Sequence, residues 1–219
     1  MQQVKEIMNE DNDLQGNLKV AISPEISSFP LITSLTSFVK EYTAISLCIK
    51  EMDHFRAFDS YEGNVLIHPF IKEREDLSQH PLATITYGLY TSQAYLDQSD
   101  IPQKLEDLKD HQFISSRLTI ALFPDIASFA ITKTQERGKL LIQINSITTR
   151  IQFAAQGLGI ITAPKDHPAL KQGNLIQILP YLPNTTLKIY YIYPKQFEPL
   201  KRIKVFGEYL KIRLSEKYL

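Results

Sequence analysis

The first part of the chain alternates short apolar runs with longer amphipathic ones, and this alternation limits the folds that it can adopt. Three runs, at 17–22 (NLKVAI), 44–50 and 64–68, have the length and composition of buried strands. A short helix is expected at 53–61. Strand–helix–strand–helix–strand order is typical of a parallel sheet with crossover helices. Apolar side chains at helical spacing between the first two runs are Phe29, Leu31, Ile32, Leu35, Phe38, Val39 and Tyr42, and Ser27 or Ser28 can cap that helix.

Two longer strands are expected at 82–90 (LATITYGLY) and 185–194 (TTLKIYYIYP). If the final helix, at 199–218, packs back on the first set of elements, these strands link two lobes. The cleft between such lobes is the default place for a ligand. Between the long strands the sequence predicts short helices at 92–98 and 102–110, followed by a hairpin with arms at 128–133 and 139–145. A helix at 147–156, a strand at 158–163, a short helix at 166–172 closed by Gly173, and a strand at 175–179 are expected next. The final helix is expected to bury Ile203, Phe206, Leu210 and Leu214.

Two glycines flank one leucine in the stretch AAQGLGIITAP, at 154–164. Gly157 fits the position after a helix end, where a left-handed backbone costs glycine little. Gly159 lets the following strand run close to its neighbour. A phosphate-binding loop needs the reverse order, a strand before the glycines and a helix after them. Both glycines are therefore predicted to be structural.

The charge balance and the single cysteine narrow the function classes. Lys plus Arg and Asp plus Glu both number 24, so the formal net charge is zero, which argues against a surface devoted to nucleic acid. Cys48 alone cannot form an internal disulfide or a cysteine-based zinc site, and its run AISLCI predicts a small core residue. The five histidines lack metal-ligand spacing, and GxSxG, P-loop, HExxH and GxGxxG motifs are absent. We therefore expect no enzyme activity, no metal and no cofactor.

The chain shows no apolar signal-peptide core and no membrane-spanning apolar run. This predicts a cytoplasmic protein that does not bind membranes. The basic residues near the C-terminus are interpreted as a solvated helix face rather than as a nucleic-acid site; they are Lys195, Lys201, Arg202, Lys204, Lys211 and Arg213.

Several segments, in order and spacing, resemble the effector-binding domain of LysR-type transcriptional regulators, from about Gly16 to the C-terminus. They are GNLKVAI, YEGNVLIHP, GLYTSQAYL, IPQKLEDLKDH, INSITTRIQFAAQGLGIITAP, LKQGNLIQILP and LKIYYIYP. The resemblance implies an α/β fold of the type 2 periplasmic-binding-protein class, with two Rossmann-like lobes joined by two crossover strands. It implies 16–86 with 190–219 as lobe I, 87–189 as lobe II, and 1–15 as the remnant of a linker helix.

The resemblance also implies a function. A small-molecule effector, which the sequence does not identify, would bind in the cleft between the lobes and modulate DNA binding by the full-length protein. Regulators of this family bind DNA through an N-terminal winged helix-turn-helix that is not recognisable here. We favour an isolated effector domain over a natural relative without that part. The alternative function is a stand-alone solute-binding or interaction module of the same fold.

A homodimer is also implied, through antiparallel pairing of helices from the two lobes. Candidate contact residues, for which core packing is the alternative, are Phe38, Val39, Tyr42, Ile151 and Phe153.

Candidate ligand-binding residues in lobe I follow the expected strands, because ligands of parallel α/β sheets bind beyond the strands' carboxyl ends. Ser23, Glu25, Ile26 and Ser27 follow the first strand; capping by the serines and solvation of Glu25 are the alternatives. Asp53 follows the second strand, where an N-cap role is slightly favoured over ligand contact. His68 and Pro69 follow the third, where a hydrogen-bonded structural histidine is the favoured interpretation. Asn64 stands where the family usually has an acidic residue.

Candidates in lobe II lie on either side of the helix at 147–156. Asn145, Ser146 and Thr148 are at its start, where Asn145 or Ser146 can also cap it. Thr162 and Ala163 end the glycine-flanked strand and are expected to meet the ligand. Tyr87 and Tyr90 lie on the first long strand and are interpreted as core or hinge packing.

Overall fold

The computed structural model describes residues 14–23, 26, 31–52, 63–122, 124, 140–182 and 185–218. The chain divides into two compact units, one drawn from residues 1–85 and 188–219 and the other from 86–187. The helix predicted at 53–61, the caps at Ser27 or Ser28 and the hairpin arm at 128–133 lie outside the described residues.

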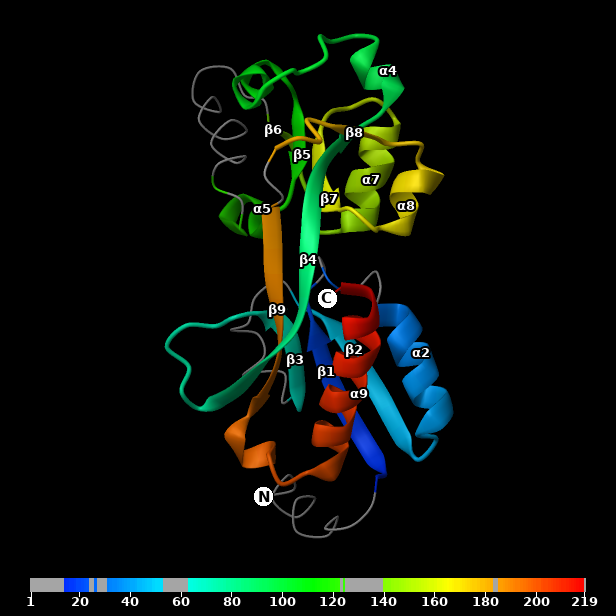
Figure 1. Cartoon of the computed structure of the whole chain (residues 1–219), viewed down its shortest axis with the longest axis vertical. Coiled ribbons are helices and arrows are strands. Elements are labelled where there is room, and N and C mark those ends of the chain that lie inside the picture. The colour runs from blue at the N-terminus through cyan, green and yellow to red at the C-terminus, as the bar shows by residue number, and fades with distance from the viewer. Residues whose placement is uncertain are drawn as a thin grey trace. The chain divides into compact units, whose positions relative to one another are not determined.

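The sheet of the first unit is built around a central parallel strand. Strand β1 (Gly16–Ile22) pairs in parallel with β2 (Ile45–Glu51) on one side and with β3 (Val65–Pro69) on the other (Figure 1). Side chains of β1 from Val20 onward are buried, as expected for a strand covered on both faces. The three strands predicted in this region are confirmed within one residue at each end.

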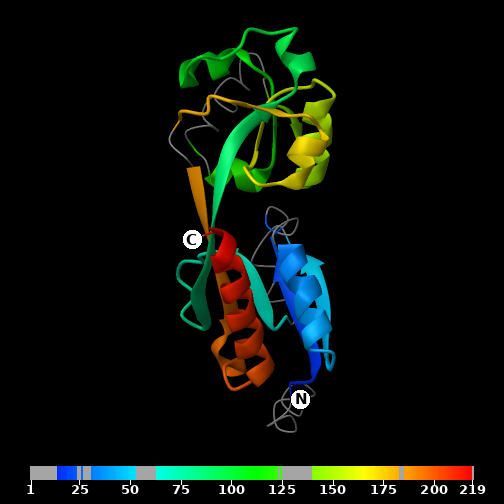
Figure 2. The same ribbon diagram turned by 45° about the vertical axis from the view of Figure 1, so that its right-hand side comes forward.

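Two helices pack together in the first unit. Helix α2 (Leu31–Glu41) and the last helix, α9 (Lys201–Tyr218), lie side by side (Figure 2). The ring of Phe38 lies 4.8 Å from that of Phe206, in an edge-to-face contact that is favourable for aromatic pairs. The final helix therefore packs on the first set of elements as predicted, and its four predicted core residues are buried.

Two long strands run from one unit into the other. Strand β4 (Leu77–Thr91) and β9 (Thr185–Pro194) are neighbours in the strand order β2-β1-β3-β9-β4-β7. Strand β9 is antiparallel to β3. Pro81 has no N–H to donate to a neighbouring strand, and it lies in the part of β4 outside residues 87–91, with which β7 and β8 pair. The two long strands expected from the sequence are thus present.

The second unit contains one pair of parallel strands and two antiparallel additions to β4. Strand β5 (Phe113–Ser115) pairs in parallel with β6 (Leu140–Gln143), while β7 (Ile161–Pro164) and β8 (Ile176–Ile178) pair antiparallel with β4. The second arm of the predicted hairpin is therefore β6, and its described partner is β5. The helices in the described part of this unit are α4 (Gln93–Leu96), η1 (Leu105–Asp110), α5 (Arg117–Leu122), α7 (Ile147–Ala155) and α8 (Pro168–Gln172); η2 (Lys195–Phe197) belongs to the first unit.

Helix α7 ends in the glycine cap that the sequence predicts. Gly157 has φ +78°, and its N–H donates to the Ala154 carbonyl at 3.0 Å. The Leu158 N–H donates to the Phe153 carbonyl at 3.3 Å. These two bonds form a Schellman motif, which satisfies carbonyls that the helix end would leave unpaired.

Helix α8 ends at Gln172 with Gly173 as its C-cap, as predicted. Its left-handed residue is Asn174, with φ +49°, whereas Gly173 has φ −85°. The Leu175 N–H donates to the Leu170 carbonyl at 2.9 Å, which completes a second Schellman motif. An added Cβ at Gly173 would lie 3.2 Å from the Ala169 carbonyl oxygen, which is a tight contact.

The prediction that Cys48 is a core residue is wrong, because its side chain is exposed. Among the described strands, β2 has only β1 as a neighbour. Alternate side chains of a strand point to opposite faces, so Cys48 lies on the face opposite the buried Ile45. An apolar run on an edge strand does not guarantee burial on both faces.

Candidate ligand-binding edges

The carboxyl ends of three parallel strands meet in the first unit. The Ser23 N–H donates to the Ile67 carbonyl at 3.2 Å, and the Met52 N–H donates to the Ile22 carbonyl at 2.9 Å. These bonds place Ser23, Met52 and His68 next to one another, where β1, β2 and β3 end. We call these three residues the first polar edge.

Ser23 is the distinctive residue of the first polar edge. It is 0% exposed, and its hydroxyl has no hydrogen-bond partner among the described residues. Both backbone groups of Ser23 are hydrogen-bonded, since its N–H donates to the Ile67 carbonyl and its carbonyl accepts from the Ile26 N–H at 2.8 Å. A buried hydroxyl without a partner costs about 1–3 kcal/mol. The Ser23 hydroxyl is therefore an unsatisfied buried group at the end of a strand, where it can still form a hydrogen bond.

His68 is held by the backbone next to it. Its Nδ1 donates to the Pro69 carbonyl at 2.9 Å, because a carbonyl oxygen only accepts. The side chain is 8% exposed. This contact favours the structural interpretation of His68. Asn64 takes the place of an acidic residue by accepting from the Lys19 N–H through Oδ1 at 2.9 Å.

The other predicted residues of the first lobe divide into two groups. Ile26 is buried and lines a small apolar cavity of about 20 Å³ with Leu31 and Ile67, which is room for about one water. Glu25, Ser27 and Asp53 lie outside the described residues.

Carboxyl ends of strands also meet in the second unit. The Ile144 N–H donates to the Ser115 carbonyl at 2.8 Å, and the Ile160 N–H donates to the Gln112 carbonyl at 2.8 Å. Because β5 is parallel to β6 and Phe113 of β5 forms a parallel bridge to Ile160, the chain leaves β5, β6 and β7 at the same edge. We call three residues the second polar edge: Ser116 and Asn145, which follow β5 and β6, and Thr162, which lies within β7.

Hydroxyl groups cap the two helices that begin at the second polar edge. The Ser146 hydroxyl accepts from the Thr149 N–H at 3.2 Å, so the predicted cap of α7 is confirmed. The Ser116 hydroxyl accepts from the Thr119 N–H at 3.0 Å at the start of α5. Asn145 and Thr148 are exposed, whereas Thr162 and Ala163 are buried. The end of β7 thus presents less side-chain surface than predicted from its position alone.

The buried side chain of Arg150 links the elements that carry the second polar edge through hydrogen bonds. It is 0% exposed although it is charged. Its Nη1 donates to the Thr119 hydroxyl at 3.0 Å and to the Thr162 carbonyl at 3.4 Å. A buried guanidinium requires such acceptors, because its desolvation is costly. Arg150 therefore fixes α7 relative to α5 and β7.

Sequence reasoning missed Ser116 and Arg150 as contributors to this edge. Strand β5 has only three residues, so FIS gives no periodicity, and Ser116 was not recognised as the cap that follows a strand. Arg150 stands among Ile147, Ile151 and Ala154 on the buried face of α7. A charged residue on an otherwise apolar helix face is the signal that could have identified it.

The two tyrosines on β4 pack as predicted. Tyr87 and Tyr90 are buried, and Tyr90 belongs to the core cluster of the second unit with Ile114 and Ile151. Burial, with a smaller contribution from the nearby Asp166 carboxylate, raises the pKa of Tyr90 above its ordinary value.

Two further features bear on the class of protein. Among the described residues, no three histidine, cysteine or carboxylate side chains gather as they would around a metal ion. None of the helices in the described part of the chain has the length and apolarity that crossing a membrane requires.

Similarity to known proteins agrees with this architecture. The family described as the LysR substrate binding domain matches residues 11–215. The uncharacterized HTH-type transcriptional regulator YhjC of Escherichia coli K12 is 26% identical over 204 residues, which cover 90% of this chain and 67% of that protein. The chain thus spans about two thirds of the length of this relative.

Solved structures show the same fold. The regulatory domain of CrgA, a LysR-type transcriptional regulator from Neisseria meningitidis, superposes with a TM-score of 0.75 at 19% identity, over 91% of this chain and 99% of that one. The effector binding domain of QuiR, solved in complex with shikimate, gives a TM-score of 0.73 at 16% identity, over 94% and 100% of the two chains. The two lobes with two crossing strands are the type 2 periplasmic-binding-protein-like fold, and the chain belongs to the LysR substrate-binding-domain family.

Proposed function

We propose that this domain binds a small-molecule effector at the first polar edge and transmits the binding to a DNA-binding part of a bacterial cytoplasmic regulator. Membership of the LysR substrate-binding family supports the ligand-sensing role. In this proposal lobe I comprises 16–86 and 190–219, lobe II comprises 87–189, and 1–15 belong to a linker helix. The domain senses and does not catalyse, in keeping with relatives that are transcriptional regulators.

The unsatisfied hydroxyl of Ser23 is the observation that carries this proposal. It is buried at the carboxyl end of a parallel strand, where α/β sheets bind their ligands. A polar ligand atom would satisfy it. Asn145, at the second polar edge, is exposed and remains the candidate for ligand contact in the second unit.

A thermal-shift screen of metabolites tests the proposal. A ligand present at 100 times its Kd adds about 2.7 kcal/mol of stability, which is a Tm increase of about 5–10 °C for a chain of this size. Ser23→Ala should leave the unliganded protein as stable as the wild type or more stable, because it removes a buried group without a partner. It should also reduce the ligand-induced shift.

Ser34→Ala is the matched control, because Ser34 is also buried but lies on α2. Its ligand-induced shift should equal that of the wild type. The proposal fails if no metabolite raises the Tm, or if Ser23→Ala and Ser34→Ala respond equally to a confirmed ligand.

We also propose that the domain forms a homodimer through the outer surface of α2 and β2. Ile32 and Val39, seven residues apart on α2, are 53% and 45% exposed, and Ile49 on β2 is 46% exposed. Phe38 and Ile151 are buried in the cores of their units, so we interpret them as core residues and no longer as candidate dimer contacts.

Sedimentation should show a dimer for the wild type and a monomer for Val39→Glu. A dimer for Val39→Glu as stable as the one formed by the control Thr33→Glu would refute this interface.

A further inference from the structure

We propose that helix α8 is an acid-sensitive element of the second unit, because the cap at its start requires a neutral histidine. Helix α8 begins after His167, whose Nδ1 accepts a hydrogen bond from the Ala169 N–H at 3.2 Å. An imidazole nitrogen that accepts this bond cannot carry a proton. Protonation of His167 at Nδ1 therefore removes the cap, and the first turn of α8 opens more easily as the pH falls.

Helix α8 depends on this cap more than a longer helix would. It has only five residues, and helices shorter than about 12–15 residues are marginal without other support. Pro168 occupies the first helical position and has no N–H, so Ala169 supplies the first N–H of the helix that needs an acceptor. The next one, from Leu170, donates to the His167 carbonyl at 3.0 Å. His167 thus accepts from the first two donors of α8.

The surroundings of His167 disfavour a positive charge on its ring. The side chain is 5% exposed, and a buried charge is costly unless it is paired. The helix dipole also opposes a cation at the start of α8. In the described part of α8, the turn before it and the neighbouring α7, β7 and residues 86–91 of β4, one carboxylate stands against three cations. The titratable and charged side chains of this set are Arg150 of α7, Lys165 and Asp166 of the turn, Lys171 of α8, and Tyr87 and Tyr90 of β4.

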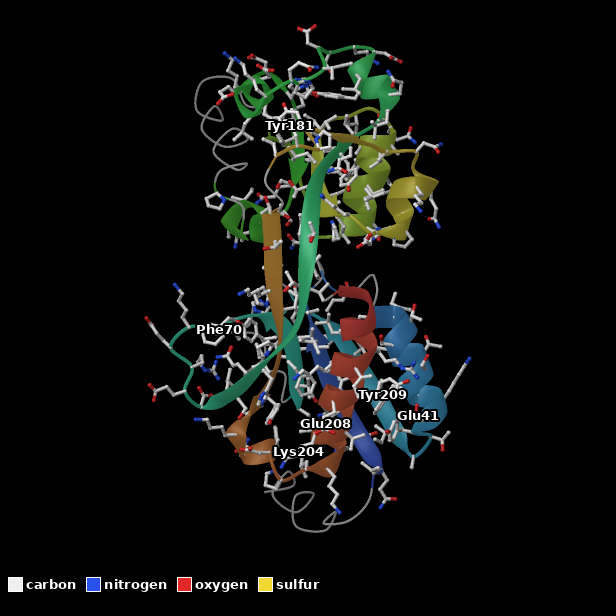
Figure 3. All side chains as sticks on the ribbon, viewed as in Figure 1. Glu41, Phe70, Tyr181, Lys204, Glu208 and Tyr209 are labelled. Atoms are coloured by element: carbon white, nitrogen blue, oxygen red, sulfur yellow. The ribbon has the colours of Figure 1, made fainter. Side chains whose placement is uncertain are left out.

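The packing of α8 connects its state to α7. Helix α8 lies beside α7 (Figure 3). Leu170 of α8 is 4% exposed and belongs to the core cluster that contains Ile147 and Ile151 of α7. Opening the first turn of α8 moves Leu170 away from this cluster and removes support from one side of α7. Because α7 begins directly after the segment Asn145–Ser146, acid also loosens the support of the second polar edge.

The pH range of this response follows from the proton that the opened helix can bind. A free histidine side chain takes up a proton below about pH 6.5, whereas the capped helix excludes the proton from Nδ1 of His167. The opened state therefore binds more protons than the capped state, and the stability of α8 rises with pH. The contribution of the cap is fully present above about pH 7 and is lost progressively as the pH falls below about 6.5.

Hydrogen exchange of the Ala169 amide, measured by NMR and corrected for its intrinsic rate at each pH, reports the opening of α8 directly. In the wild type we expect the protection factor of Ala169 to fall about fivefold between about pH 7.5 and pH 5.5. His167→Asn should keep the protection at the higher pH, because an asparagine oxygen caps helix starts and does not titrate in this range. Its protection should therefore stay constant down to the lower pH.

A control variant and a second measurement make the test specific. His80→Asn removes an exposed histidine of the first unit and should leave the pH dependence of Ala169 as in the wild type. Ring ¹⁵N signals of the wild type should show Nδ1 of His167 without a proton at about pH 7.5. No effector is present, so the outcome is independent of the proposed ligand site. The proposal is overturned if Nδ1 carries a proton at that pH, if the wild-type protection does not change, or if His167→Asn has the same pH dependence as the wild type.

Discussion

Gly159→Ala provides a severe test of the packing at the start of β7. Gly159 has φ +156°, in a region that residues with a side chain rarely enter. A Cβ there would lie 2.6 Å from the backbone carbonyl oxygen of Gln112. That carbonyl accepts the Ile160 N–H at 2.8 Å, so moving it away costs a hydrogen bond between β5 and the start of β7.

The expected loss of unfolding free energy is the sum of these effects. A residue held in a backbone region that only glycine favours costs about 1–3 kcal/mol, and a weakened backbone hydrogen bond adds about 0.5–1.5 kcal/mol. We therefore expect Gly159→Ala to destabilise the protein by about 1.5–4.5 kcal/mol. Gly157→Ala should cost only the left-handed penalty of about 1–2 kcal/mol, since its Cβ would lie at an ordinary 3.4 Å from Ala94 Cβ.

Urea unfolding followed by far-ultraviolet circular dichroism measures the difference, since the chain has no tryptophan to report by fluorescence. The two variants carry the same substitution two residues apart, so each controls for the other. A loss for Gly159→Ala that equals or falls below the loss for Gly157→Ala would refute the close approach of Gly159 to Gln112.

Three other predictions follow from the caps and from a buried tyrosine. Ser146→Ala should lower the unfolding free energy by about 1 kcal/mol and Ser146→Asp should restore most of it, because both serine and aspartate cap the start of α7; equal urea midpoints for the two variants would contradict this. Asn174→Gly should raise the unfolding free energy by up to about 1 kcal/mol, since glycine adopts the left-handed backbone at no steric cost, and a lower midpoint would contradict the cap. Burial raises the pKa of Tyr191 well above its usual 10.0, so the unfolded chain loses this proton first and stability is lost as pH rises above about 10. Tyr191→Phe should be less stable than the wild type at pH 7, where it lacks the bond to Ile203, and should lose less stability between pH 9 and pH 11 in thermal unfolding; parallel losses for the two proteins would exclude this role.

The parts of the fold that the sequence predicts are those with strong periodicity. Helices α2 and α9 and strands β1 to β3 have apolar patterns long enough to distinguish a period of two from one of 3.6. The cap at Gly157 follows from a glycine after an apolar helix. Strand β5 is too short for any period. The end of α8 at Gly173 is predicted correctly, but the left-handed residue that follows it is Asn174, which the sequence does not single out.

The polar edges were only partly predictable, for a physical reason. Strand ends in a parallel sheet can be located from the sequence, which identified Ser23, Asn145 and Thr162. Whether a side chain at a strand end is satisfied, buried or exposed depends on its three-dimensional neighbours. The unmet hydrogen bond of Ser23 and the burial of Arg150 therefore became visible only in the structure. The prediction that Cys48 is buried was wrong for a related reason. The order of the strands in the sheet decides that β2 lies at an edge, and this order depends on the three-dimensional fold.

Isothermal titration of a confirmed effector against Ser23→Ala tests the central claim most directly. Our account predicts that Ser23→Ala raises the Kd about fivefold or more, because it removes a hydrogen bond of about 1 kcal/mol, while Ser34→Ala leaves the Kd unchanged. An effector that binds Ser23→Ala with the affinity of the wild type would contradict the claim that the first polar edge holds the ligand.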